Sequence, residues 1–209
     1  PRLQELDLTG CLTGTPSTSK TNVTAAALVS VFTGCPLLRK LELSLPCVTN
    51  EVLSCIPVLL PHLVGLSISG TNATDRLTGT YGALQHLRVR DFESKLSTSF
   101  FEGLHFPSLL RLDATIHVNE SYTHLVTACP RLEALSFYGC TSDVSLHSLV
   151  LPSLTWLDLE DTYSWTAQAY EGMTAYNLPQ LTSLSVRGDY VSLSNQTLVD
   201  FACSFPGLT

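Results

Sequence analysis

One phrase recurs along the whole chain: a leucine, two variable residues, a second leucine, one variable residue and a third apolar residue. Clear copies are Leu132-Glu-Ala-Leu135-Ser-Phe137 and Leu154-Thr-Trp-Leu157-Asp-Leu159. The leading leucines lie 21 to 27 residues apart, with one interval of 35, and they are Leu3, Leu38, Leu63, Leu84, Leu109, Leu132, Leu154, Leu181 and Leu208. A fixed period in this range predicts a repeat solenoid, in which each repeat buries its apolar side against its neighbours.

Each phrase alternates apolar and polar positions, as a half-buried strand does. Between the phrases, apolar residues fall at helical spacing, which predicts helices over 24–32, 50–60, 97–103, 120–129, 166–176 and 195–203. Prolines at 36, 61, 107, 130, 152, 179 and 206 separate a helix end from the next strand. The predicted fold is therefore an α/β solenoid, with a parallel sheet on the concave face and helices on the convex face. The interval of 35 holds a loop-like insertion at 13–21, and the interval of 21 has room only for a turn or a 3₁₀ segment on the outer side.

Residues 1–209 are expected to form one solenoid segment of about eight repeats plus the start of a ninth. The chain opens on a repeat at Pro1 and stops at Pro206-Gly-Leu208-Thr209, where another strand should begin, and neither end supplies a polar cap. We therefore expect a piece of a longer protein. The net charge of −7 argues against nucleic acid as a partner, and no apolar run is long enough for a membrane span.

The line Cys129-Pro-Arg-Leu132-Glu-Ala-Leu135-Ser-Phe137-Tyr-Gly-Cys140 carries cysteines at both ends of the phrase. It resembles the cysteine-containing subclass of leucine-rich repeats, best known from F-box proteins. The lines that begin at Pro1 and Cys35 match the same pattern, whereas Gly82 replaces the proline in the fourth repeat and Ala114 replaces a leucine in the fifth. The resemblance implies a recognition arm of a ubiquitin-ligase adaptor or scaffold, although these residues contain no F-box.

The cysteines and histidines show no catalytic or metal-binding pattern. The seven cysteines form no Cys-x-x-Cys pair and no zinc-finger spacing, and they occupy positions typical of small buried residues, which favours reduced, structural thiols; disulfides are the alternative. The six histidines are scattered, and neither a Gly-x-Ser-x-Gly motif nor a glycine-rich phosphate loop occurs. We expect no enzyme activity, no metal and no cofactor.

Four glycosylation sequons leave the compartment open. They begin at Asn22, Asn72, Asn119 and Asn195, an excess that favours a secreted or cell-surface protein. Asparagine beside serine or threonine is also typical of helix N-caps, and three of the four stand where a helix should start. A cytoplasmic or nuclear location is the first expectation, and a secreted or surface location is the alternative.

The positions between the leucines should point away from the core and tile one continuous surface, because adjacent strands lie under about 5 Å apart. Two patches are predicted there: a basic one of His86, Arg88, Arg90 and Arg111, and an aromatic one with acids, made of Tyr138, Trp156, Asp158 and Glu160. Arginine and tryptophan are frequent at binding hot spots. We expect a protein partner with an acidic or phosphorylated segment. A secreted or surface ligand-binding ectodomain and a structural brace in a large assembly are the alternative functions.

Overall fold

The structure, a computed structural model, describes residues 2–9, 23–70, 78–90, 98–115, 123–138, 146, 149–160, 173, 177–187 and 194–208. These residues form β1 (Glu5–Leu8), α1 (Ala25–Gly34), β2 (Lys40–Leu43), α2 (Asn50–Leu59), β3 (Gly65–Ser69), β4 (Gly79–Thr80), β5 (His86–Arg90), the 3₁₀ helix η2 (Thr98–Phe101), β6 (Leu104–His105), β7 (Arg111–Thr115), α3 (Thr123–Ala128), β8 (Ala134–Tyr138), β9 (Trp156–Glu160), β10 (Ser183–Arg187) and α4 (Asn195–Ser204).

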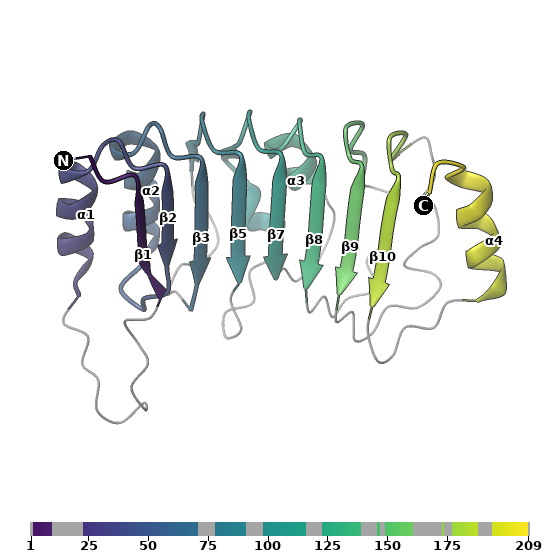
Figure 1. The fold of residues 1–209 in the computed structure, drawn as a ribbon, viewed down its shortest axis with the longest axis horizontal. Coiled ribbons are helices and arrows are strands. Elements are labelled where there is room, and N and C mark those ends of the chain that lie inside the picture. The colour runs from purple at the N-terminus through teal and green to yellow at the C-terminus, as the bar shows by residue number, and fades with distance from the viewer. Residues whose placement is uncertain are drawn as a thin grey trace, which may run out of the picture.

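One sheet of eight parallel strands dominates the fold, in the order β1-β2-β3-β5-β7-β8-β9-β10 (Figure 1). Each strand carries the second leucine and the third apolar residue of one phrase, the leading leucine lies just before the strand, and the phrases are aligned without a shift. The second leucine of each phrase pairs with its counterpart on the next strand, along the line Leu6, Leu41, Leu66, Leu87, Leu112, Leu135, Leu157 and Leu184. The predicted parallel ladder is confirmed.

The same turn precedes the strands of this sheet from β2 onwards. The amide of Leu38 donates to the carbonyl of Cys35 at 3.1 Å, which closes a turn around Pro36 and Leu37. The leading leucines 63, 84, 109, 132, 154, 181 and 208 make the equivalent bond to the residue three positions earlier. The fourth repeat keeps this turn although Gly82 stands in place of the proline. The leucine amide therefore closes the same turn in the eight repeats from Leu38 to Leu208, and the proline only favours the turn.

The core lies between the sheet and the helices α1, α2 and α3, which cover one face of the sheet (Figure 1). On β2, Leu41 and Leu43 are fully buried, whereas Lys40 and Glu42 are exposed. Helix α1 begins after Thr24, whose hydroxyl accepts the amide of Ala27 at 3.2 Å, and it buries Leu28 and Phe32 one turn apart. We call the opposite side of the sheet, which none of the described helices covers, the open face.

The helix predictions for 24–32, 50–60 and 195–203 are correct to within two residues at both ends. Within the predicted range 120–129, α3 covers Thr123–Ala128, and residues 120–122 lie outside the described part of the chain. Within the helix predicted over 97–103, the structure has only the 3₁₀ helix η2 over Thr98–Phe101, and β6 begins at Leu104 and pairs with β4 in a separate two-stranded parallel sheet. Residues 13–21 lie outside the described part of the chain, as do 166–176 apart from Met173.

A polar contact joins α2 to the segment that follows it. Pro57 lies inside α2, so the carbonyl of Leu53 has no amide four residues ahead of it. The hydroxyl of Tyr81 donates to this carbonyl at 2.8 Å, and the Tyr81 ring stacks on Phe106 with centroids 5.2 Å apart. Burial raises the pKa of the Tyr81 hydroxyl above its ordinary range. The tyrosine replaces the donor that proline removed from the helix.

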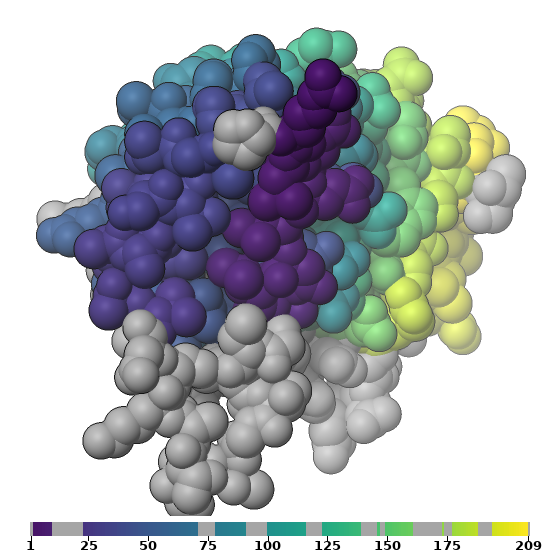
Figure 2. All heavy atoms as spheres, turned by 60° about the vertical axis from the view of Figure 1, so that its left-hand side comes forward, coloured from purple at the N-terminus to yellow at the C-terminus, as the bar shows by residue number. Residues whose placement is uncertain are grey.

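The sheet has two outer edges, at β1 and at β10. Figure 2 looks towards the first, where residues 2–9 form the outermost layer beside α1. Leu6 and Leu8 are only partly buried there, although the matching Leu41 and Leu43 of β2 are fully buried. Within the described residues, no helix is long and apolar enough to cross a lipid bilayer.

Candidate partner-binding surface

The structure places all eight predicted contact residues on neighbouring strands of the open face. Strand β5 carries His86, Arg88 and Arg90, and β7, next to it, carries Arg111. Tyr138 is on β8, and Trp156, Asp158 and Glu160 are on β9. Their positions follow from the two-residue alternation of each strand, whereas their role in binding stays a prediction.

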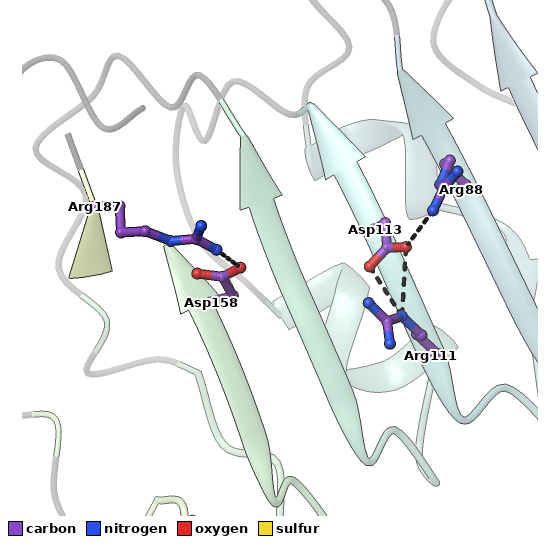
Figure 3. A network of polar contacts seen from close by, with 5 residues as sticks. All are labelled: Arg88, Arg111, Asp113, Asp158 and Arg187. Carbon is purple, nitrogen blue, oxygen red and sulfur yellow. Dashed lines mark hydrogen bonds and ion pairs between the residues drawn. The ribbon is translucent and has the colours of Figure 1, made fainter. Parts of the chain in front are cut away.

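Asp113 holds two of the predicted arginines. It lies directly opposite Arg88 in the register of β5 and β7, and an Arg88 guanidinium nitrogen is 3.5 Å from its carboxylate (Figure 3). Arg111 precedes Asp113 by two residues, so both point to the same face, and its Nε donates to the two carboxylate oxygens at 3.2 and 3.4 Å. The Asp113 side chain is only 6% exposed, whereas those of Arg88 and Arg111 are about half exposed. The buried carboxylate is thus compensated by two cations that remain accessible.

A second ion pair holds Arg187 on β10. Its guanidinium donates to Asp158 Oδ2 at 2.7 Å and lies 3.8 Å from Glu160 (Figure 3). The hydrogen bond and the charge of Asp158 raise the pKa of Arg187 above its ordinary value, and Glu160 adds to this effect. Asp158 is only 2% exposed. It therefore positions Arg187 and is not itself accessible to a partner, in contrast to the sequence-based expectation.

The two predicted patches form one surface. The guanidinium of Arg90 lies over the ring of Tyr138, 4.6 Å from its centroid, and that of Arg111 lies 5.1 Å from the ring centroid of Trp156. At these distances, the positive charge is attracted by the electron-rich ring face. We call Arg90, Arg111, Tyr138 and Trp156 the arginine–aromatic cluster. It extends across β5, β7, β8 and β9.

Some buried polar atoms beneath this surface have no hydrogen-bond partner among the described residues: Arg90 Nε, Ser136 Oγ and Asp158 Oδ1. Ser136 and Asp158 are opposite each other in the register of β8 and β9. Buried polar atoms in folded proteins are nearly always paired. Their concentration on the open face distinguishes it from the apolar side of the sheet.

The open face is hollowed over β2, β3 and β5. The hollow has a volume of about 560 Å³, and its lining includes Lys40, Glu42, Gly65, Ser67, His86, Arg88, Arg111 and Asp113. Gly65 and Ser67 belong to the middle strand β3 and are small, whereas the strands on both sides carry long side chains. We call this depression the β3 hollow.

The sequence-based selection omitted Asp113, Arg187 and Gly65. Asp113 and Arg187 were outward positions in their own phrases, and aligning the phrases places Asp113 opposite Arg88. The sequence signal for the ion pair was an acidic residue opposite an arginine at equivalent positions of two adjacent repeats. The sequence signal for the β3 hollow was weaker: two small outward-facing residues in one repeat, between two repeats whose outward-facing residues have long side chains.

The remaining candidate positions show no further site. Among the described residues, no three His, Cys, Asp or Glu side chains are grouped so as to hold a metal ion. Cys129 is buried as expected, but Cys203 is exposed on α4, so the expectation of burial is wrong for it. Cys35, Cys47 and Cys55 are partly buried. Cys11 and Cys140 lie outside the described residues.

Of the four sequon asparagines, the structure describes Asn195, whereas Asn22, Asn72 and Asn119 lie outside the described residues. Asn195 is exposed and is the first residue of α4. The N-cap is Ser194, whose Oγ accepts the amide of Thr197 at 3.0 Å. Helix capping therefore does not explain why asparagine stands at position 195. It does explain the threonine at position 24, which belongs to the first sequon.

Comparison of the chain with models of known protein families and with curated protein sequences gives no significant match.

Proposed function

We propose that this chain is a non-enzymatic protein–protein interaction module, a leucine-rich repeat solenoid whose open face is concave and binds a partner with an acidic or phosphorylated segment. The observation that carries the proposal is the arrangement of Arg88, Arg90 and Arg111 with Tyr138 and Trp156 on the open face. These residue types are enriched in interface hot spots.

The solenoid assignment is supported by the repetition within the fold. The strands of the large sheet follow one another in chain order, the equivalent leucines are aligned, and one turn recurs before the strands. The cysteine-containing line 129–140 adds the resemblance to repeats of F-box proteins. On this resemblance we propose the recognition arm of a ubiquitin-ligase adaptor or scaffold, located in the cytoplasm or nucleus.

The arginines are suited to binding because their positions are held in advance. Asp113 orients Arg88 and Arg111, and the rings of Tyr138 and Trp156 support Arg90 and Arg111. A side chain that is already ordered loses less conformational entropy when a partner binds. Guanidinium groups pair with carboxylates or phosphates through two parallel hydrogen bonds. An anionic segment beside an apolar residue is the partner chemistry that fits.

An ectodomain of a secreted or cell-surface protein is the second candidate. It is favoured by Asn195, an exposed sequon asparagine that the helix cap does not require. The same open face would then bind an extracellular ligand.

The test is a selection on the folded chain from two libraries of synthetic random peptides, one unmodified and one containing phosphoserine, followed by calorimetric titration of the peptides obtained. We expect the double variant Arg88→Ala/Arg90→Ala and the variant Trp156→Ala each to weaken binding by about tenfold or more. Affinity should also fall as salt rises. The control is Asp200→Lys on α4, far along the chain from the cluster and exposed, which should bind as the parent does.

Two results would overturn the proposal. One is a selection that yields no binding peptide. The other is a peptide whose binding survives both open-face variants and is lost with Asp200→Lys, since the contact would then involve α4.

A further inference from the structure

We propose that the β3 hollow binds the phosphate of a phosphorylated side chain in the partner segment. This inference rests on the proposed function and gives it a specific anchor point. It differs from the sequence-based expectation of a basic patch made of His86, Arg88, Arg90 and Arg111, because the lining of the hollow also includes Lys40 and does not include Arg90.

The size of the β3 hollow fits a side chain and not a single water molecule. Its volume of about 560 Å³ lies within the range of small-ligand pockets, roughly 300–1,000 Å³. The space exists because Gly65 has no side chain and Ser67 has a short one. The Gly65 backbone does not require glycine, since a Cβ added there would meet only Lys40 Cγ, at an ordinary contact distance of 3.6 Å.

The charge of the lining favours an anion. Lys40, Arg88 and Arg111 face two carboxylates, Glu42 and Asp113, and the imidazole of His86 adds a further donor. The chain as a whole has a net charge of −7, so the hollow is a cationic region on an acidic protein.

The two cations on opposite sides of the hollow, Arg88 and Lys40, are available to donate hydrogen bonds to a ligand. Among the described residues, Arg88 makes one ion pair, at 3.5 Å to Asp113, and half of its side chain is exposed. Lys40 is 3.0 Å from Glu5, but both side chains are more than 60% exposed, so this pair is weak and readily exchanged. Arg111 is less available, because its Nε is bonded to Asp113 and its guanidinium lies over Trp156.

The arrangement suits phosphate better than carboxylate. A carboxylate is satisfied by one guanidinium fork. A phosphorylated side chain carries a charge of about −1.5 to −2 and three acceptor oxygens. Lys40 on β2 is in register with Gly65 and Arg88 on β5 with Ser67, so these two cations stand on opposite sides of β3, about 12 Å apart at the backbone by normal strand spacing and rise. An anion above Gly65 and Ser67 can accept from both sides.

The experiment titrates the isotope-labelled chain with N-acetyl-phosphoserine amide and follows backbone amide shifts by NMR. N-acetyl-glutamate amide and inorganic phosphate serve as parallel probes. We expect saturable shifts at Gly65, Ser67 and Arg88, with phosphoserine binding at least about fivefold more tightly than glutamate because of its greater charge. Inorganic phosphate should bind more weakly than phosphoserine, because it lacks the rest of the side chain.

Two variants locate the site. Gly65→Val fills the hollow without removing a charge, and valine is well suited to a strand. Arg88→Ala removes the main donor. Both should abolish the saturable shifts. The matched controls are Gly82→Val, a position with open space around it, and Arg131→Ala, an exposed arginine before β8, and both should bind as the parent does. Thermal unfolding by circular dichroism verifies that each variant is folded.

Failure of this inference is distinct from failure of the proposed function. The inference is overturned if Gly65→Val binds phosphoserine normally, if glutamate binds as tightly as phosphoserine, or if inorganic phosphate binds as tightly as phosphoserine. If selected peptides depend on Trp156 but not on Gly65, the open face binds partners and the β3 hollow is not the anchor. If phosphoserine occupies the hollow but no peptide binds the open face, the inference about phosphate binding is supported and the proposed function is overturned.

Discussion

The hydrogen bond between Tyr81 and the carbonyl of Leu53 offers a sharp test of how successive segments of the chain stabilise one another. We predict that Tyr81→Phe destabilises the fold through this bond alone. The ring packing should persist, because phenylalanine keeps the stacking on Phe106, whose centroid lies 5.2 Å away. Only the hydroxyl, which donates at 2.8 Å in a buried position, is lost.

The expected cost follows from the lack of any alternative donor. Since Pro57 has no amide, the Leu53 carbonyl in this variant is left buried without its partner. A buried unsatisfied carbonyl costs about 1–3 kcal/mol, and phenylalanine regains part of this because its burial is more favourable. We therefore expect a loss of about 1–2 kcal/mol in the free energy of unfolding, measured by urea denaturation.

A double-mutant cycle with Pro57→Ala isolates the mechanism. Alanine restores the amide, which can donate to Leu53 within α2, so Tyr81→Phe should cost about 1 kcal/mol less in the Pro57→Ala background. Tyr138→Phe is the control, because Tyr138 lies on the open face, is only partly buried and keeps the ring that contacts Arg90. The reasoning is refuted if Tyr81→Phe costs nothing, or if it costs the same in both backgrounds.

Three further predictions concern the core, the thiols and the compartment. Leu135→Ala should lower the free energy of unfolding by about 2–5 kcal/mol, because Leu135 is fully buried; amide hydrogen exchange should increase first in β7–β9, and a uniform increase along the chain would contradict the neighbour-only stacking. Burial raises the pKa of the Cys129 thiol from 9.0 to about 12. The unfolded chain therefore loses this proton first, and stability should fall between pH 9 and pH 12 by up to ~1.4 kcal/mol per pH unit. Cys129→Ala should reduce this slope and Cys203→Ala should not; equal slopes for Cys129→Ala and the parent would argue against a buried thiol. Finally, intact mass under non-reducing conditions from the native source should show no glycan on Asn195 and no disulfide if the protein is cytoplasmic or nuclear, and either modification would reject that location.

Much of the fold could be predicted because its main signals are local and repeated. Alternation within each phrase predicts which side of a strand is buried, and the recurrence of the phrase predicts that equivalent leucines align. Leu41, Leu66, Leu87 and Leu135 accordingly form one ladder. The outward positions of Arg88 and Trp156 follow from the same alternation.

The predictions failed where a local pattern competes with contacts distant in sequence. Residues 97–103 have helical spacing, but Leu104 and His105 pair with Gly79 and Thr80, which limits the helical segment to one short 3₁₀ turn. The exposure of Cys203 also depends on what packs against α4, and the residue itself carries no signal of this.

The sequence by itself determined the repeat, the direction in which each strand side chain points and the residue types on the open face. Tertiary structure alone decided which of those side chains meet. Arg88 and Asp113 are 25 residues apart in the chain, and Asp158 and Arg187 are 29 apart, yet each pair makes an ion contact because neighbouring strands are in register. Long arginine and aromatic side chains lean across adjacent strands and bury the two carboxylates, while Gly65 and Ser67 leave a hollow between longer neighbours. Burial and pairing on a sheet surface depend on the neighbours across the strands, and only the assembled sheet supplies those neighbours.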